Sequence, residues 1–228
     1  MNERPKAMSF QAPSRRRPLS SAALAFVLLG SEGVALAQAQ DDKQPPESPA
    51  VRRSGLFVGM STGLSLAAAD GNPKAFALRD DPSATVHTGV GYGARYKPVI
   101  GVAVADWLNL AIGGSFGSSQ SDKYRSDTYA FIFHLEAFPA YSMGGTFRDL
   151  GLELNFGAGS SKAVLRSTGE EVASTSVVSL VGIGAFWEPW RVWRFAAGPH
   201  VGYERSFSRY YSRDDVSIGL RVAFYAGP

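Results

Sequence analysis

Two histidine–carboxylate pairs are the first places in this sequence where catalytic chemistry could lie. His134 precedes Glu136 by two residues, and His200 precedes Glu204 by four. In an extended chain this even spacing puts both members of a pair on one face, where the carboxylate could orient the imidazole as a general base. No convincing serine nucleophile accompanies either pair, and no spacing brings these histidines and His87 together as metal ligands. We therefore predict no enzyme, no cofactor and no metal site.

The histidines belong to segments in which two classes of side chain alternate. Between Gly89 and Ala105 the even positions are mostly bulky and apolar, whereas the odd positions are small or charged. This period of two is typical of a strand whose two faces meet different surroundings. The pattern recurs along the chain and predicts eight strands, at residues 54–66, 87–105, 108–119, 128–142, 150–163, 173–187, 193–206 and 214–225.

The composition of the less bulky face distinguishes two kinds of barrel. Glycine, alanine and serine dominate that face, with a few charges. A soluble lipocalin-like barrel that binds a ligand would cover its exterior with long polar side chains. Glycine covers an exterior poorly but fits the narrow lumen of an eight-stranded barrel. We therefore predict an all-β fold, an eight-stranded antiparallel up-and-down transmembrane β-barrel whose bulky face meets lipid. The soluble barrel is the alternative.

The same parity sends ten polar side chains toward the lumen. A barrel of eight strands is only wide enough for its side chains to fill. Charges in such a space must be paired, because an unpaired buried charge is strongly destabilising. We therefore predict a lumenal polar network of salt bridges rather than a proton path, an ion pore or a hydrolytic site. Its members are Arg95, Lys97, His134, Glu136, Glu153, Asn155, Arg194, His200, Glu204 and Arg221.

Residues 1–39 have the layout of a secretory signal peptide. The basic run Arg15–Arg17 precedes a short apolar stretch from Leu19 to Leu29, and two small-x-small sites follow at 35–37 and 37–39. This order predicts export and cleavage at one of the two sites. Glycine and glutamate interrupt the apolar run, which is shorter than the roughly 20 residues of a membrane-spanning helix.

The composition of the exported part excludes nucleic acid as a partner. Residues 40–53 are polar and rich in proline, which predicts a disordered linker before a barrel at 54–228. Of the 23 basic and 20 acidic residues, five basic and two acidic ones lie in residues 1–40, which leaves 18 of each. A nucleic-acid-binding domain would keep a basic stripe. The chain has no cysteine, which excludes a disulfide framework and a thiolate zinc site.

The connections predict which end of the barrel faces outward. Transmembrane barrels have short periplasmic turns and longer extracellular loops. The short links lie at 105–108, 142–149 and 188–192, and the longer or more polar ones at 67–86, 119–127, 164–172 and 207–213. We assign the longer links to the outer loops; a further hairpin within 67–86 would raise the strand count to ten. The short-link end carries a predicted periplasmic-side aromatic girdle, formed by Trp107, Trp187, Trp190 and Trp193.

The last predicted strand carries the most specific motif. Ser217, Gly219, Val222 and Phe224 fit the order polar-x-Gly-x-x-hydrophobic-x-hydrophobic. With the eight alternating segments, this motif resembles the insertion signal of small bacterial outer-membrane β-barrels of the OmpA and OmpX transmembrane-domain type. Typical members end on the aromatic residue, whereas Tyr225 and three more residues follow here. The resemblance implies a Gram-negative outer membrane, insertion by the barrel-assembly machinery, and contact with outer-membrane lipid and lipopolysaccharide.

These patterns favour a non-enzymatic outer-membrane barrel with a structural or surface-interaction role. Its extracellular loops would contact a surface ligand that no motif names. Tyr210 and Tyr211, flanked by Arg209 and Arg213, are residue types common at contact surfaces. The alternatives are a narrow, porin-like channel for small solutes or ions and a lipid-modifying outer-membrane enzyme.

Overall fold

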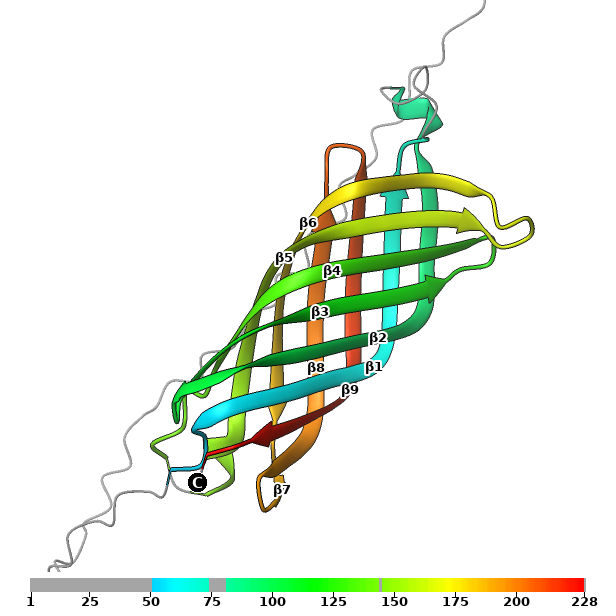
Figure 1. Ribbon diagram of the computed structural model, residues 1–228. Helices are drawn as coiled ribbons and strands as arrows, with labels where there is room; N and C mark the ends of the chain where they lie inside the picture. The colour runs from blue at the N-terminus through cyan, green and yellow to red at the C-terminus, as the bar shows by residue number, and fades with distance from the viewer. Residues whose placement is uncertain (1–50, 74–80, 144, 228) are drawn as a thin grey trace, which may run out of the picture. The chain divides into compact units, whose positions relative to one another are not determined.

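The structure is a computed structural model that describes residues 51–73, 81–143 and 145–227 (Figure 1). The predicted signal peptide and residues 40–50 of the predicted linker lie outside the described residues. The strands are β1 (Gly55–Gly71), β2 (Val86–Ala105), β3 (Leu108–Gln120), β4 (Tyr124–Ala137), β5 (Leu150–Leu165), β6 (Glu171–Trp187), β7 (Trp190–Val192), β8 (Phe195–Phe207) and β9 (Tyr211–Tyr225). Two short 3-10 turns are η2 (Pro82–Ala84) and η3 (Thr146–Asp149). Within the described part, no helix is long and apolar enough to cross a bilayer.

The sheet closes on itself because β8 pairs with β6 on one side and with β9 on the other. Every pairing is antiparallel, and β9 returns to β1. Following directly paired residues from strand to strand once around the barrel, starting at Arg205 of β8, leads back to β8 at Phe195. The register of the closed sheet is therefore staggered by ten residues, from 205 to 195. Such a stagger accompanies tilted strands. The predicted eight-stranded up-and-down barrel is confirmed, and the three-residue β7 continues the pairing that β6 leaves.

The apolar side chains face outward and the polar ones inward. On β1, Leu64 is 74% exposed whereas its neighbour Ser65 is 2% exposed. The same alternation runs through the burial patterns of the other long strands. A soluble barrel would show the reverse, because water favours polar exteriors. The fold is therefore that of a transmembrane β-barrel, as the parity of the sequence predicts.

On two strands the outward side chains change in the order expected across a bilayer. On β4 they pass from Arg125 through Tyr129 and Phe131. On β8 they pass from Arg205 to Tyr203 and then to apolar residues. Tyrosine prefers the interface, where its ring is half apolar and its hydroxyl meets water. These rows place one edge of the apolar belt near the tyrosines.

The two ends of the barrel differ. Phe57 of β1 pairs with Tyr225 of β9, so β1 begins and β9 ends at the same end of the barrel, which we name the terminal end. It also contains the connections 106–107, 138–149 and 188–194 (Figure 1). The opposite end, named the distal end, contains the connections 72–85, 121–123, 166–170 and 208–210.

The predicted contrast in connection length is wrong for most connections. Three distal connections have only three to five residues, whereas 138–149 at the terminal end has twelve. The distal strands continue as hairpins beyond their predicted ends, because strand pairing satisfies their backbone groups. Only 72–85 is long, and its residues 74–80 lie outside the described residues. β1 and β2 flank it directly, and the barrel wall has eight strands rather than ten.

Two strand boundaries differ from prediction near prolines. β4 ends at Ala137, not at residue 142, because Phe138 turns into the lumen and Pro139 cannot donate to a strand ladder. Within the predicted link 188–192, residues 188–189 break the ladder and residues 190–192 form β7, and the turn follows at 193–194. Trp193 takes a positive φ of 55°, as the two-residue turns of hairpins require.

Candidate functional site

Charged and polar side chains fill the lumen, and we take this filling as the candidate site. Nine of the ten side chains of the predicted lumenal network are buried there: Arg95, Lys97, His134, Glu136, Glu153, Asn155, His200, Glu204 and Arg221. Arg194 differs. It is exposed in the turn before β8, with its guanidinium 5.1 Å from the ring of Trp193. The prediction began the strand at residue 193, whereas the turn breaks the parity at 193–194.

Arg221 and Glu136 lie at the centre of the part of the network that is nearer the terminal end. The Arg221 NH2 group donates to Glu136 at 2.8 Å, and its Nε donates to Glu188 at 3.2 Å. Asn109 also donates to Glu136, at 2.8 Å. His134 Nε2 lies 2.6 Å from the other Glu136 oxygen. Both oxygens of this fully buried carboxylate are therefore occupied, which is how a buried charge is accommodated.

The two histidines connect to the next layer through β5. His134 Nδ1 lies 2.6 Å from Asn155 Oδ1, and the Asn155 amide donates to Glu153 at 3.3 Å. Glu153 also forms an ion pair with Lys97 and lies 3.1 Å from His200 Nε2. The carboxylate beside His200 is thus Glu153 on β5, which β6 separates from β8. Spacing along one strand suggests Glu204, whereas the closed lumen brings Glu153 from a non-adjacent strand to His200.

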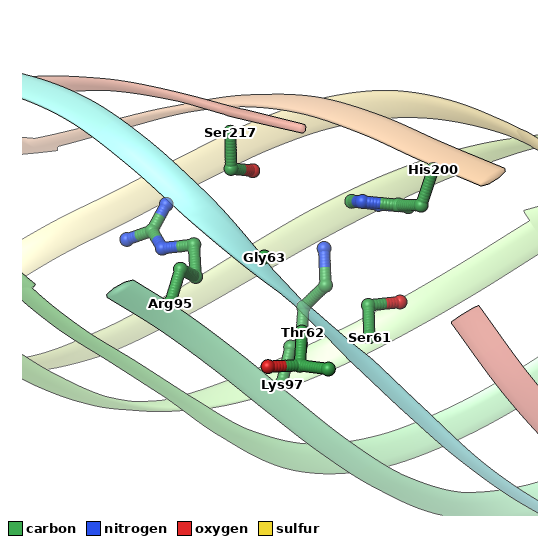
Figure 2. Close-up of a pocket in the computed structure, with 7 residues that line it drawn as sticks. All are labelled: Ser61, Thr62, Gly63, Arg95, Lys97, His200 and Ser217. Atoms are coloured by element: carbon green, nitrogen blue, oxygen red, sulfur yellow. The ribbon is translucent and has the colours of Figure 1, made fainter. Parts of the chain in front are cut away.

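Glu204 forms the third layer, nearer the distal end. It accepts from Ser115 at 2.8 Å, and the Arg95 NH1 group lies 3.1 Å away. Beside this layer a cavity between Ser61, Arg95 and Ser217 leaves about 10 Å³ in which the centre of a water molecule could lie (Figure 2). That is room for roughly one water molecule and not for a solute.

The terminal end is closed by Arg53, which the prediction placed in the disordered linker. Its side chain is fully buried, and its NH2 group donates to Asp149 at 2.6 Å. The guanidinium carbon lies 3.5 Å from the ring centroid of Phe138, and Glu188 lies 3.7 Å away. A buried arginine that stacks on an aromatic ring and pairs with carboxylates is a rigid closure.

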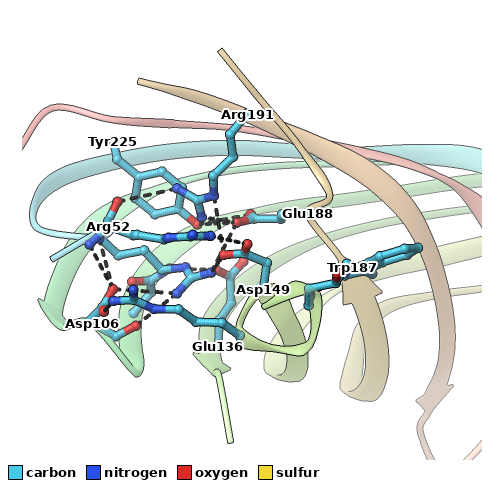
Figure 3. Close-up of polar contacts among 12 residues, drawn as sticks. Arg52, Asp106, Glu136, Asp149, Trp187, Glu188, Arg191 and Tyr225 are labelled. Carbon is cyan, nitrogen blue, oxygen red and sulfur yellow. Dashed lines mark hydrogen bonds and ion pairs between the residues drawn. The ribbon is translucent and has the colours of Figure 1, made fainter. Parts of the chain in front are cut away.

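Each connection at the terminal end supplies a carboxylate to this closure (Figure 3). Asp106 accepts from the backbone N–H groups of Arg52 and Arg53, at 3.2 and 3.1 Å. Glu188 accepts from Arg191 at 2.7 Å. Asp149 is the last residue of η3. The sequence holds a signal for this closure, since one acid stands in or beside each of these turns and two arginines stand just before β1.

The distal end is closed mainly by apolar contacts. Tyr211 is buried in a cluster with Ala69, Ala163, Ala173 and Val178. Its hydroxyl lies 2.9 Å from that of Ser126, and it faces the lumen. Tyr211 therefore does not belong to an outer contact surface, as its predicted place in a loop had suggested.

Arg213 also lies in the lumen and not on the rim. Its NH2 group donates to Asp215 at 2.8 Å, and its NH1 group donates to the backbone oxygen of Ser126 at 2.9 Å. The prediction omits Tyr211 and Arg213 from the lumen because the predicted loop extends to residue 213, whereas β9 begins at Tyr211.

The motif of the last strand has a structural reason at its glycine. A Cβ on Gly219 would lie 2.0 Å from the backbone oxygen of Thr62, so no other residue fits there. Ser217 is buried toward the lumen, whereas Val222 is exposed on the outer face. Phe224 packs on Phe195, with ring centroids 5.2 Å apart.

Tyr225 follows the motif and turns into the lumen. Its hydroxyl donates to Glu188 at 3.0 Å, and its ring stacks on Phe57 at 5.5 Å. The residue beyond the aromatic position of the motif thus completes the terminal closure.

All four tryptophans of the predicted girdle lie in or beside the connections of the terminal end. Every one of the four indoles is at least 37% exposed, and Trp193 is the most exposed at 76%. They are Trp107, Trp187, Trp190 and Trp193.

Comparisons with known proteins find similar structures only. No family model matches the chain, and no curated protein matches it. The Ail protein of Yersinia pestis, an attachment invasion locus protein, is 16% identical over 73% of this chain and 98% of its own, with a TM-score of 0.42. Neisserial surface protein A is 11% identical over 74% and 98%, with a TM-score of 0.44. OprG from Pseudomonas aeruginosa is 11% identical over 77% and 98%, with a TM-score of 0.40. The barrel described above rests on its own strand pairing.

Proposed function

We propose that this protein is a non-enzymatic barrel of a Gram-negative outer membrane, sealed along its lumen, that acts through its outer surface and distal rim. The observation that carries the proposal is the filled lumen. Arg53 closes one end, Tyr211 closes the other, and paired charges occupy the space between. Opening a path would leave several buried charges unpaired, at a cost of several kcal/mol each.

The filled lumen also favours this role over a channel or an enzyme. The cavity in the ion-pair layers holds roughly one water molecule. His134 lies 2.6 Å from Glu136 and His200 lies 3.1 Å from Glu153, and both imidazoles are buried in the lumen, out of reach of a lipid substrate. A sealed barrel offers its surroundings only its outer face and its rims, so a structural or surface-interaction role remains.

In the proposed orientation the distal end faces outward. The exposed tryptophans at the terminal end fit a membrane interface, where aromatic girdles anchor barrels, and we assign this interface to the periplasmic side. The terminal end would then face the periplasm, where the barrel-assembly machinery would read the motif on β9. Connection 72–85 is the longest at the distal rim and would make the main contact with a surface partner.

The absence of native cysteine allows a direct test of orientation. Single cysteines would replace Thr168 in the distal connection 166–170 or Thr146 at the terminal end, both exposed. A membrane-impermeant maleimide added to intact cells should label T168C, whereas T146C should react only after the outer membrane is permeabilised. Labelling in the opposite order would refute the orientation. A soluble protein with no heat-dependent gel shift would refute the membrane location.

A further inference from the structure

On the outer face, three cations lie where the apolar belt ends toward the distal rim. Arg125 on β4, Lys162 on β5 and Arg205 on β8 all have exposed side chains. Exterior positions of a membrane barrel tolerate basic residues near the interface, where the cost falls to about 0–1 kcal/mol. The three cations differ in whether a nearby carboxylate of the protein balances their charge.

Arg205 is balanced by an acid on the neighbouring strand. Its Nε lies 3.8 Å from Asp214, which also accepts from the hydroxyl of Tyr203 at 2.6 Å. Asp214 and Arg205 are directly paired in the β8–β9 ladder. This cation therefore has its counter-charge within the barrel.

Lys162 has no such balance. Asp127 lies directly opposite it in the β4–β5 ladder. That carboxylate is already held by Arg125 Nε at 2.9 Å and by the hydroxyl of Ser118 at 2.7 Å, and it is 2% exposed. Among the described residues, no carboxylate lies within 4.0 Å of the Lys162 ammonium.

Arg125, on the same outer face as Lys162, has hydrogen-bond donors that Asp127 does not occupy. Its Nε binds Asp127, and its two terminal nitrogens form no hydrogen bond or ion pair within the described part of the chain. Arg125 is diagonal to Lys162 across the ladder, about 7–8 Å apart on average for such positions. A guanidinium and an ammonium at this separation can hold one phosphate between them.

The position of the pair relative to the belt points to a lipid. Tyr129 lies two residues below Asp127 on the same outer face and packs on Phe116, with centroids 6.2 Å apart. The cations thus lie just beyond the interfacial ring of the barrel, at the depth of lipid head groups. An anionic head group there attracts each nearby basic residue by about 1 kcal/mol.

We propose that Lys162 and the terminal nitrogens of Arg125 bind a phosphate on the lipid anchor of lipopolysaccharide. The inference rests on the proposed function, because it needs the distal end to face the outer leaflet. The occupant is chosen for its charge: its phosphate groups supply the anion that Lys162 lacks within the protein.

The test measures binding of purified, folded full-length protein to lipid A in detergent by native mass spectrometry. Lys162→Gln should weaken binding of lipid A that carries both phosphates about fivefold. Lys162→Arg should retain wild-type binding. Arg205→Gln is the matched control and should change binding less than twofold, because Asp214 already holds that cation.

Three outcomes would overturn the proposal. They are unchanged binding by Lys162→Gln, equal binding of lipid A from which both phosphates have been removed, and equal loss of phosphatidylglycerol binding in the same variant. The last would identify a general phosphate contact. A heat-dependent gel shift verifies that each variant is folded. The cysteine labelling above separates failure of this inference from failure of the orientation.

Discussion

The two ends of this barrel are closed by opposite means. At the terminal end Arg53, Asp149 and Glu188 form buried ion pairs drawn from three separate segments. At the distal end Tyr211 packs among alanines, and its hydroxyl contacts that of Ser126, to which Arg213 also donates. The first closure depends on charge and geometry, and the second on close packing. A narrow barrel therefore needs no plug domain, because side chains of either kind suffice.

The largest predicted effect comes from the layer between the ends. Arg221→Ala removes the arginine that pairs with the fully buried Glu136 and one of the arginines that pair with Glu188. We expect a loss of about 3–5 kcal/mol in the free energy of unfolding, measured by urea titration of the refolded barrel. Arg205→Ala, on the outer face, should change it by less than about 0.5 kcal/mol. A similar loss in both variants would contradict the account of the lumen.

Breaking the terminal closure should have a smaller effect. Arg53→Ala should cost about 2–3 kcal/mol, less than Arg221→Ala, because Asp149 keeps contacts with Arg52 at 2.5 Å and Arg191 at 3.4 Å. Arg53→Lys should recover only part of the loss, since an ammonium neither stacks on Phe138 nor binds in a fork. Both values come from the same urea titration. A variant as stable as wild type would show that the terminal segment is not part of the closure.

The distal closure should respond to packing more than to polarity. Tyr211→Phe removes only the contact with the Ser126 hydroxyl and should cost about 1 kcal/mol. Tyr211→Ala should cost about 3 kcal/mol, because it leaves a cavity among the alanines. If the two substitutions cost the same, the hydroxyl contact and not packing would hold this end.

The smallest effect concerns pH at the distal connection. The hydroxyl and backbone N–H of Ser83 hold the pKa of Asp81 below its ordinary value of 3.8. A lowered pKa in the folded state means that the contribution of Asp81 to stability is present above 3.8 and is lost as the pH falls below it. A side-chain NMR titration should show the depressed pKa in wild type and a return toward 3.8 in Ser83→Ala. An Asp81 pKa at its ordinary value in the wild-type protein would contradict the turn geometry.

The sequence predicts the barrel and most of its lumen because both depend on a period of two. Glu153 and Arg221 could be placed inside by parity alone, as each lies within an uninterrupted strand. Parity says nothing about partners across strands, so the contact of His200 with Glu153 appears only with the register.

Parity also fails where a strand breaks. Pro189 interrupts the ladder after β6, and the adjacent Glu188 turns fully inward. Arg53 lies before the first strand, where no alternation exists to place it. Tyr211 is the first residue of β9, but its polar sequence neighbours are typical of a loop, so the sequence pattern places the start of this strand too late.

Single-channel recording in a planar bilayer measures whether the lumen is sealed. We expect no conductance steps from wild-type protein. Arg53→Ala and Tyr211→Ala alone should also remain silent, because the other closure persists in each. The double variant should conduct if the middle layers hydrate once both ends are open. A stable open channel in the wild-type protein would contradict the sealed lumen and with it the proposed function.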